Sequence, residues 1–293
     1  MIAVILGIGS ALVFGTADFL GGIASKRISP LRVTAIAGVT GFVTLLIALP
    51  VFGGTWSLPA VFYGFVSGVS GSVAIVLLYA CLAIGPMSIL SPLTAVVSAV
   101  VPMTIGLARG ERLGAIGYVA LGLALVAVVL VGFVKEEHAV RPSLRGLLMA
   151  TASGLLIGLF LVAIDLTPRD SGLVPLVVNR LTNAAIMFGI VGIVALATRW
   201  RRPETRPAGG WASSGWRAGL WFAIWCGFID AIANAGILAS LRLGDLSITA
   251  VLTALYPAGT IVLAAIVLRE RIAIVQYVGL ALAITAAAMF ALV

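Results

Sequence analysis

The chain has 293 residues, of which 62% are hydrophobic and 10% charged, and its mean hydropathy is +1.23. Soluble domains carry about 25% charged residues, so this composition excludes a soluble globular protein and predicts an all-α integral membrane protein. The net charge of +8 does not indicate a nucleic-acid partner, because no basic and aromatic module accompanies it.

Ten apolar stretches are long enough to cross a bilayer, which takes about 20 residues for a hydrocarbon core of roughly 30 Å. The first, at residues 2–24, is too long for the apolar core of a signal peptide and is expected to be retained. The connections leave no room for a soluble domain. We predict transmembrane helices at residues 2–24, 31–52, 59–84, 87–108, 113–134, 146–166, 172–198, 218–241, 246–268 and 272–293.

The chain repeats itself. A shift of 159 positions aligns Ala80–Leu125 with Ala239–Ile284 without a gap, and 16 of the 46 pairs are identical. Each half holds five predicted spans, an odd number, so the second half is expected to be inverted relative to the first. Inverted repeats of this kind are typical of secondary transporters. The predicted repeats are residues 1–134 and 145–293, with a linker at 135–144.

Three motifs resemble the EamA-like family of the drug/metabolite transporter superfamily. Phe14-Gly15-Thr16 is similar to the family's Trp-Gly-Ser-like start, and Gly110-Glu111-Arg112 and Arg269-Glu270-Arg271 are similar to its Gly-Glu-Arg signature. The resemblance covers nearly the whole chain and implies a ten-helix carrier that moves small metabolites, often outward. The chain departs from the family in one respect: an arginine is common in the second span of a half, and only Arg180 fits, because the region of Ala35 is apolar.

Two acids lie deep inside predicted spans, and a carboxylate near the bilayer centre costs about 2.5 to 3.5 kcal/mol on insertion scales. Asp18 belongs to a stripe of small residues, and Asp230 lies near the middle of its span with Asn234 one turn later. Each acid is interpreted either as a proton- or ligand-binding group or as a packing residue with a neighbouring polar partner. The stripe consists of Gly7, Ala11, Gly15, Asp18 and Gly22.

Span seven places Asn179, Arg180 and Asn183 on adjoining faces. Arg180 is predicted either to hold a substrate carboxylate or phosphate through its fork of donors or to neutralise Asp230 or Asp165. Asp165 itself is expected near the membrane interface.

Polar residues also form corresponding stripes on spans four and nine, beside prolines in both spans, and include Thr94, Ser98, Thr253 and Tyr256. They are predicted to line a pathway, although Ser and Thr in membrane helices often bond their own backbone. The pairs Glu111–Arg112 and Glu270–Arg271 are predicted to form junction ion networks or gates.

Catalysis is not expected, because the chain shows neither a Ser/His pairing nor a nucleotide-binding glycine loop. No cofactor or metal is predicted. The favoured function is a secondary active transporter that exports small metabolites or drugs by alternating access and is coupled to protons through Asp18 or Asp230. The alternatives are a passive channel, a structural membrane subunit, or an exchanger or importer of the nucleotide-sugar transporter type.

The expected partners are a small-molecule substrate and the lipid bilayer, with a monomer as a sufficient unit. The expected location is a bacterial inner membrane, crossed several times. Thirteen of the 18 Lys and Arg residues fall at odd-numbered connections and four at even-numbered ones, so the positive-inside rule predicts both termini outside. The family resemblance implies cytoplasmic termini instead.

Overall fold

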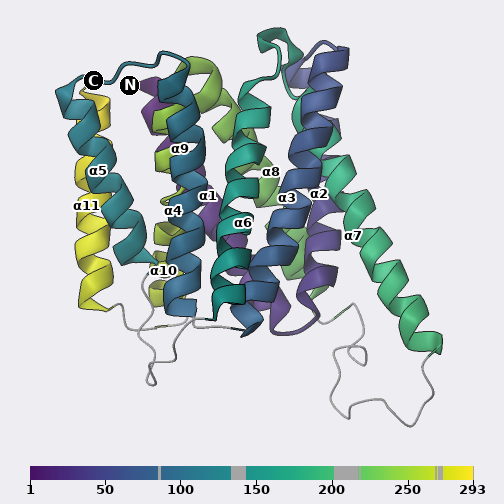
Figure 1. Cartoon of the computed structure of the whole chain (residues 1–293). Coiled ribbons are helices and arrows are strands. Elements are labelled where there is room, and N and C mark those ends of the chain that lie inside the picture. The colour runs from purple at the N-terminus through teal and green to yellow at the C-terminus, as the bar shows by residue number, and fades with distance from the viewer. Residues whose placement is uncertain are drawn as a thin grey trace.

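The computed structural model describes residues 1–84, 87–132, 143–200, 217, 219–267, 269 and 273–292. Within this part the regular structure is entirely helical (Figure 1). The elements are α1 (Ile2–Ser25), α2 (Pro30–Phe52), α3 (Leu58–Ile84), α4 (Met87–Ala108), α5 (Ala115–Val131), α6 (Leu144–Asp165), η1 (Arg169–Ser171), α7 (Val174–Trp200), α8 (Leu220–Leu243), α9 (Leu246–Thr253), α10 (Pro257–Val267) and α11 (Ile274–Ala291).

Eight segments of the described chain are long and apolar enough to cross a membrane. The last but one of them, Leu246–Val267, comprises both α9 and α10. Two shorter apolar helical stretches, Leu93–Ala108 and Ala115–Val131, lie in the same bundle. Because backbone polar groups in lipid must be satisfied within the segment, a bundle of this kind is a multi-pass membrane protein, as the composition predicts.

Local sequence signals explain several helix ends. The Ser29 hydroxyl accepts a hydrogen bond from the Arg32 N–H (3.4 Å) ahead of Pro30, and the Ser143 hydroxyl accepts one from the Gly146 N–H (3.1 Å). Both are N-caps that satisfy a backbone donor at a helix start. At the other end of α2, Gly53 adopts φ 71°, a conformation open to glycine without steric cost.

The two halves share an unusual backbone conformation. Gly110 has φ 98° and Arg269 has φ 55°, and these two residues are related by the 159-position shift of the internal repeat. Left-handed backbone is rare for residues other than glycine. Both repeat-related positions, each directly before a Glu-Arg pair in the sequence, thus have a positive φ.

The predicted helix over residues 246–268 is interrupted. α9 ends at Thr253, the chain turns through Ala254–Tyr256, and α10 begins at Pro257. Pro257 has no N–H and so cannot continue the ladder of hydrogen bonds from α9. The related helix α4, in contrast, runs without interruption from Met87 to Ala108.

Both termini lie at the same end of the bundle, called the terminal end below (Figure 1). The most extensive helix contacts form a pattern that is unchanged when the halves are exchanged: α1 packs on α8 as α6 packs on α3, and α2 packs on α8 as α7 packs on α3. The pairs α2 with α7, α4 with α9, and α5 with α11 map onto themselves. The two halves therefore interlock throughout and do not form separate domains.

Candidate functional site

An ion pair joins α7 to α8 inside the bundle. Nη2 of Arg180 lies 2.6 Å from Oδ2 of Asp230, and the two side chains are 14% and 15% exposed. The Asn234 side chain, one turn further along α8, donates to Oδ1 of Asp230 at 3.2 Å and to the Asp230 carbonyl at 2.8 Å. Of the two roles that the sequence allows for Arg180, the structure shows the pairing with Asp230.

Asp18 of α1 lies beside this pair. It is close enough to Asp230 for the two charges to repel, yet it forms no hydrogen bond or ion pair within the described part of the chain. Asp18 is exposed. A Cβ atom built on Gly22, one turn later, would have no neighbouring atom within 4 Å. Asp18 is therefore an accessible carboxylate with no partner of opposite charge.

Cys226 of α8 connects these groups. Its thiol is in hydrogen-bonding contact with the backbone of Gly21 and lies within electrostatic range of Asp18, Arg180 and Asp230. A Cβ atom on Gly21 would lie 3.2 Å from the Cys226 sulfur. α1 and α8 thus approach closely at this level, which is what brings Asp18 near the α7–α8 ion pair.

Glycines create the space for Arg180. A Cβ atom on Gly41 of α2 would lie 3.3 Å from Cδ of Arg180 and 3.3 Å from the Gly227 carbonyl oxygen, and Gly227 is itself packed on the Ala37 backbone. Small residues let membrane helices approach closely. Here they let α2 and α8 enclose the Arg180 side chain, whose Nε is buried without an acceptor among the described residues.

An aromatic pair lies about one helical turn from Asp18. Phe14 and Tyr256 meet edge to face, with ring centroids 5.5 Å apart and planes at 64°. Tyr256 occupies the interruption between α9 and α10, and both residues are partly exposed. Phe14 and Asp18, four residues apart, lie on the same face of α1, so the aromatic pair and the carboxylate are neighbours.

Asn179 and Asn183 have partners on a different helix. The Asn179 side chain donates to the Ser67 hydroxyl at 2.8 Å, and the Asn183 side chain donates to the Ser72 hydroxyl at 2.9 Å. Both amides are buried and join α7 to α3. They lie next to Arg180 in sequence, but their side chains contribute to helix packing. Sequence reasoning missed the α3 serines, because serine is common in membrane helices.

The polar residues of α4 and α9 differ in their bonding. The Thr94 hydroxyl donates to the carbonyls of Leu90 (2.9 Å) and Ala150 (3.1 Å), and the Ser98 hydroxyl donates to the Ala95 carbonyl (2.8 Å). Thr253, the repeat counterpart of Thr94, has a buried hydroxyl oxygen with no partner in the described chain. The hydroxyl next to the interruption is thus unsatisfied within the described chain, whereas its counterpart in α4 is satisfied.

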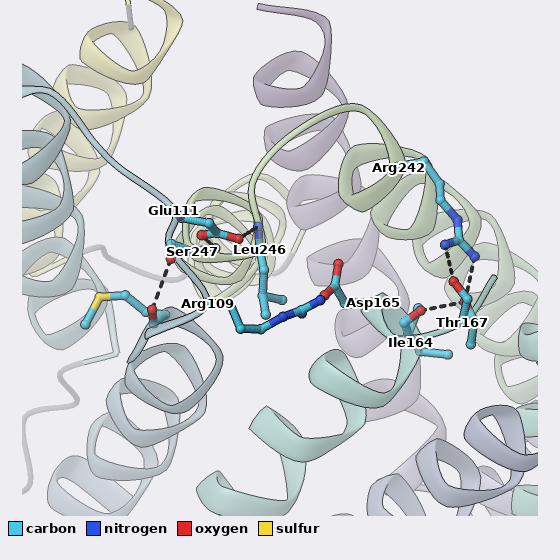
Figure 2. A network of polar contacts seen from close by, with 9 residues as sticks. Arg109, Glu111, Ile164, Asp165, Thr167, Arg242, Leu246 and Ser247 are labelled. Carbon is cyan, nitrogen blue, oxygen red and sulfur yellow. Dashed lines mark hydrogen bonds and ion pairs between the residues drawn. The ribbon is translucent and has the colours of Figure 1, made fainter. Parts of the chain in front are cut away.

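A second polar region lies at the terminal end (Figure 2). The Glu111 carboxylate accepts from the N–H groups of Leu246 (2.9 Å) and Ser247 (3.0 Å) at the start of α9. Arg109 pairs with Asp165 at 2.5 Å, which accounts for the acid expected near the interface. Arg112 is exposed, and Glu270 and Arg271 lie outside the described residues.

Arg242 completes this region, and sequence reasoning did not single it out. Its guanidinium donates to the Thr167 carbonyl and hydroxyl, both at 2.6 Å, and to the Ser171 hydroxyl at 3.3 Å. α8 is thereby fastened to the connection between α6 and α7. The hydrogen bonds and the ion pair at the terminal end thus involve residues of both halves.

Within the described residues, no group of three or more His, Cys, Asp or Glu side chains is arranged to hold a metal ion. The sequence model of the EamA-like transporter family matches the chain twice, at residues 1–133 and 144–292. The chain belongs to the EamA-like transporter family. It is thus a membrane transporter of the drug/metabolite transporter superfamily, and each half corresponds to one copy of the family unit.

Comparison with solved structures supports the fold. A chain described only as "Crystal structure of protein" superposes with a TM-score of 0.73 at 18% identity, covering 99% of this chain and 96% of that one. No curated protein matches the sequence. At this identity the solved structure shows a shared fold and gives no information about the transported solute.

Proposed function

We propose that this EamA-like transporter is a secondary carrier that exports small solutes by alternating access, using a site formed by Asp18, Arg180 and Asp230. The observation that carries the proposal is the Arg180–Asp230 ion pair with an unpaired Asp18 beside it. Ionisable residues inside membrane segments are costly and are usually retained for substrate or ion pathways. A purely structural pair would not require a third, unneutralised charge.

The alternating-access part of the proposal rests on the relation between the halves. Ten spans in two inverted five-helix repeats would let the halves exchange shapes around a site between them. The symmetric pattern of the most extensive helix contacts and the positive φ of both Gly110 and Arg269 support this arrangement. The interruption between α9 and α10 adds a non-helical segment next to α1, a feature that accompanies binding sites in carriers.

We propose that the carrier lies in a bacterial inner membrane. Its proposed source of energy is coupling to protons. One proton that crosses 100 mV supplies about 2.3 kcal/mol, enough for roughly a 50-fold gradient of a neutral solute. Asp18 is the acid best placed to exchange a proton, because Asp230 is held by Arg180 and Asn234. During the cycle, the substrate is proposed either to displace the proton from the Asp18 carboxylate or to neutralise the charge of that carboxylate.

Counterflow in proteoliposomes tests the carrier. A panel of proteinogenic amino acids, simple amines and hexoses is loaded inside, and uptake of the labelled solute is followed with and without a pH gradient. A carrier shows trans-acceleration, whereas a channel does not. We expect Asp18→Asn to abolish the pH-driven component and Asp165→Asn, an acid at the terminal end, to preserve it. If both Asp18→Asn and Asp230→Asn leave pH-driven counterflow unchanged, coupling through these acids is wrong.

A further inference from the structure

The charge of the site is not balanced. Asp18 and Asp230 are two acids, and Arg180 is one base, so the three side chains together carry one uncompensated negative charge when ionised. Arg180 has its charge matched by Asp230, and its unpartnered Nε is buried. The accessible charge that a solute would meet is therefore the carboxylate of Asp18.

Among the described residues, the helices around Asp18 place no second cation beside its carboxylate. α8 contributes Asp230 and Cys226, α7 contributes Arg180, and the segment between α9 and α10 contributes Tyr256. On α1 itself the nearest bases are Lys26 and Arg27, two turns further on and about 12 Å along the axis. The Arg27 guanidinium lies 4.6 Å from the centroid of the Phe222 ring on α8.

The aromatic pair provides an independent indication of the solute's charge. Phe14 and Tyr256 are partly exposed and lie about one turn from Asp18. Aromatic faces attract cations, by about 0.5 to 2 kcal/mol depending on desolvation, and ammonium groups are commonly recognised in this way. An anion would meet neither a free cation nor a favourable ring face here.

We infer that the site between α1, α8 and the α9–α10 interruption binds an organic cation with a single positive charge, with its ammonium group at Asp18 and its apolar part against Phe14 and Tyr256. This inference rests on the proposed function and specifies its substrate class. The neutral Arg180–Asp230 pair is a positioning element that leaves Asp18 as the counter-ion of the solute.

Equilibrium dialysis on the purified full chain tests the inference with two probes of similar size and opposite charge. Phenyltrimethylammonium is permanently cationic, and phenylacetate is anionic at neutral pH. We expect saturable binding of the cation and none of the anion. Asp18→Asn is expected to weaken cation binding at least about tenfold, Asp18→Glu to restore most of it, and Asp165→Asn to leave it at the wild-type level.

Charge compensation provides a sharper test. Asp230→Asn leaves Arg180 without its partner, so the site becomes neutral overall, and cation binding is expected to fall although Asp18 is intact. Adding Arg180→Gln to Asp230→Asn returns the net charge to one negative and is expected to recover most of the lost affinity. If the pair had only a structural role, the double variant would bind the cation more weakly than Asp230→Asn alone.

Several outcomes overturn the inference: no saturable binding of phenyltrimethylammonium, tighter binding of phenylacetate, or cation binding insensitive to Asp18→Asn. The preference between the two probes is measured on the wild-type protein and does not depend on whether any variant folds. The carrier proposal fails separately. Cation binding without trans-acceleration contradicts the carrier and leaves the inference intact. Counterflow of a neutral solute without cation binding supports the carrier and contradicts the inference.

Discussion

The carboxylate of Glu111 accepts a hydrogen bond from the backbone N–H of Ser247, 136 residues away along the chain, at 3.0 Å. Its other oxygen accepts from the N–H of Leu246. Helix starts leave such donors unsatisfied, and Asp245, at the N-cap position of α9, makes no side-chain cap of its own. A residue of the first half therefore provides the cap for a helix of the second.

Loss of this cap should destabilise the protein. We expect Glu111→Ala to lower the free energy of unfolding by about 1 to 3 kcal/mol, because two N–H groups at the start of α9 lose a charged acceptor. The measurement is the thermal midpoint in detergent. Arg112→Ala is the matched control, since Arg112 is adjacent and exposed and should change stability by less than about 0.5 kcal/mol. Equal effects of the two variants would contradict the capping role.

Asp245 should make stability depend on pH. Partial burial, and then repulsion from Glu111, raise the pKa of the Asp245 carboxyl above its usual range. A raised acid pKa means that the folded state disfavours the ionised form, so the penalty is absent below about pH 4 and develops as pH rises. Asp245→Asn should raise the thermal midpoint at pH 7, and the gain should disappear at pH 4. A gain that persists at pH 4 would point to another cause.

The two arginines of the terminal end should differ in their contribution. Arg242 is partly buried and makes three hydrogen bonds to Thr167 and Ser171, so Arg242→Ala is expected to cost about 1.5 to 3 kcal/mol. The Arg109 side chain is 50% exposed, and exposed ion pairs contribute about 0 to 1 kcal/mol. Arg109→Ala should therefore have the smaller effect. Chemical unfolding in mixed micelles measures both, and the reverse order would disprove this ranking.

Gly15 should tolerate no side chain. A Cβ atom there would lie 2.7 Å from the Thr260 N and 2.8 Å from the Gly259 Cα, both backbone atoms of α10. Gly15→Ala should separate α1 from α10, lower stability and reduce transport. Gly9 is the control on the same helix, with nothing within 4 Å of its Cβ position, and Gly9→Ala should leave both unchanged. Equal behaviour of these variants would contradict close packing of α1 on α10.

The hydrogen bonds from the asparagine side chains of α7 to the serines of α3 should be measurable as coupling energies. A double-mutant cycle that combines Asn183→Ala with Ser72→Ala isolates the 2.9 Å hydrogen bond between them. Hydrogen bonds between membrane helices average about 0.6 kcal/mol in such cycles, with a maximum near 1.7 kcal/mol. We expect a favourable coupling in that range. Additive single effects would show that Asn183 acts elsewhere.

The sequence predicts the membrane class and the internal repeat well, because span length and composition are imposed by the bilayer. It also names Asp230 as one of two possible partners of Arg180, since an intramembrane base requires a nearby acid. The choice between Asp230 and Asp165 depends on which helices are neighbours. Only the packing of α2, α7 and α8 around Gly41 and Gly227 decides it.

Other assignments depend on details that a single sequence does not contain. Asn179 and Asn183 are on the same helix as Arg180, but the rotation of α7 directs them to serines on α3. Glu111 lies between α4 and α5, and its contacts are backbone N–H groups, which no residue pattern reveals. Its role as a gate stays a prediction.

Pro257 occupies the position that Ser98 holds in the first half, and this difference coincides with the interruption of one related helix and the continuity of the other. In the proposed carrier, halves that differ chemically in this way would not make the two facing conformers equal in energy. In the carrier proposed above, this inequality would give one facing conformer the larger population before any solute or ion gradient is applied.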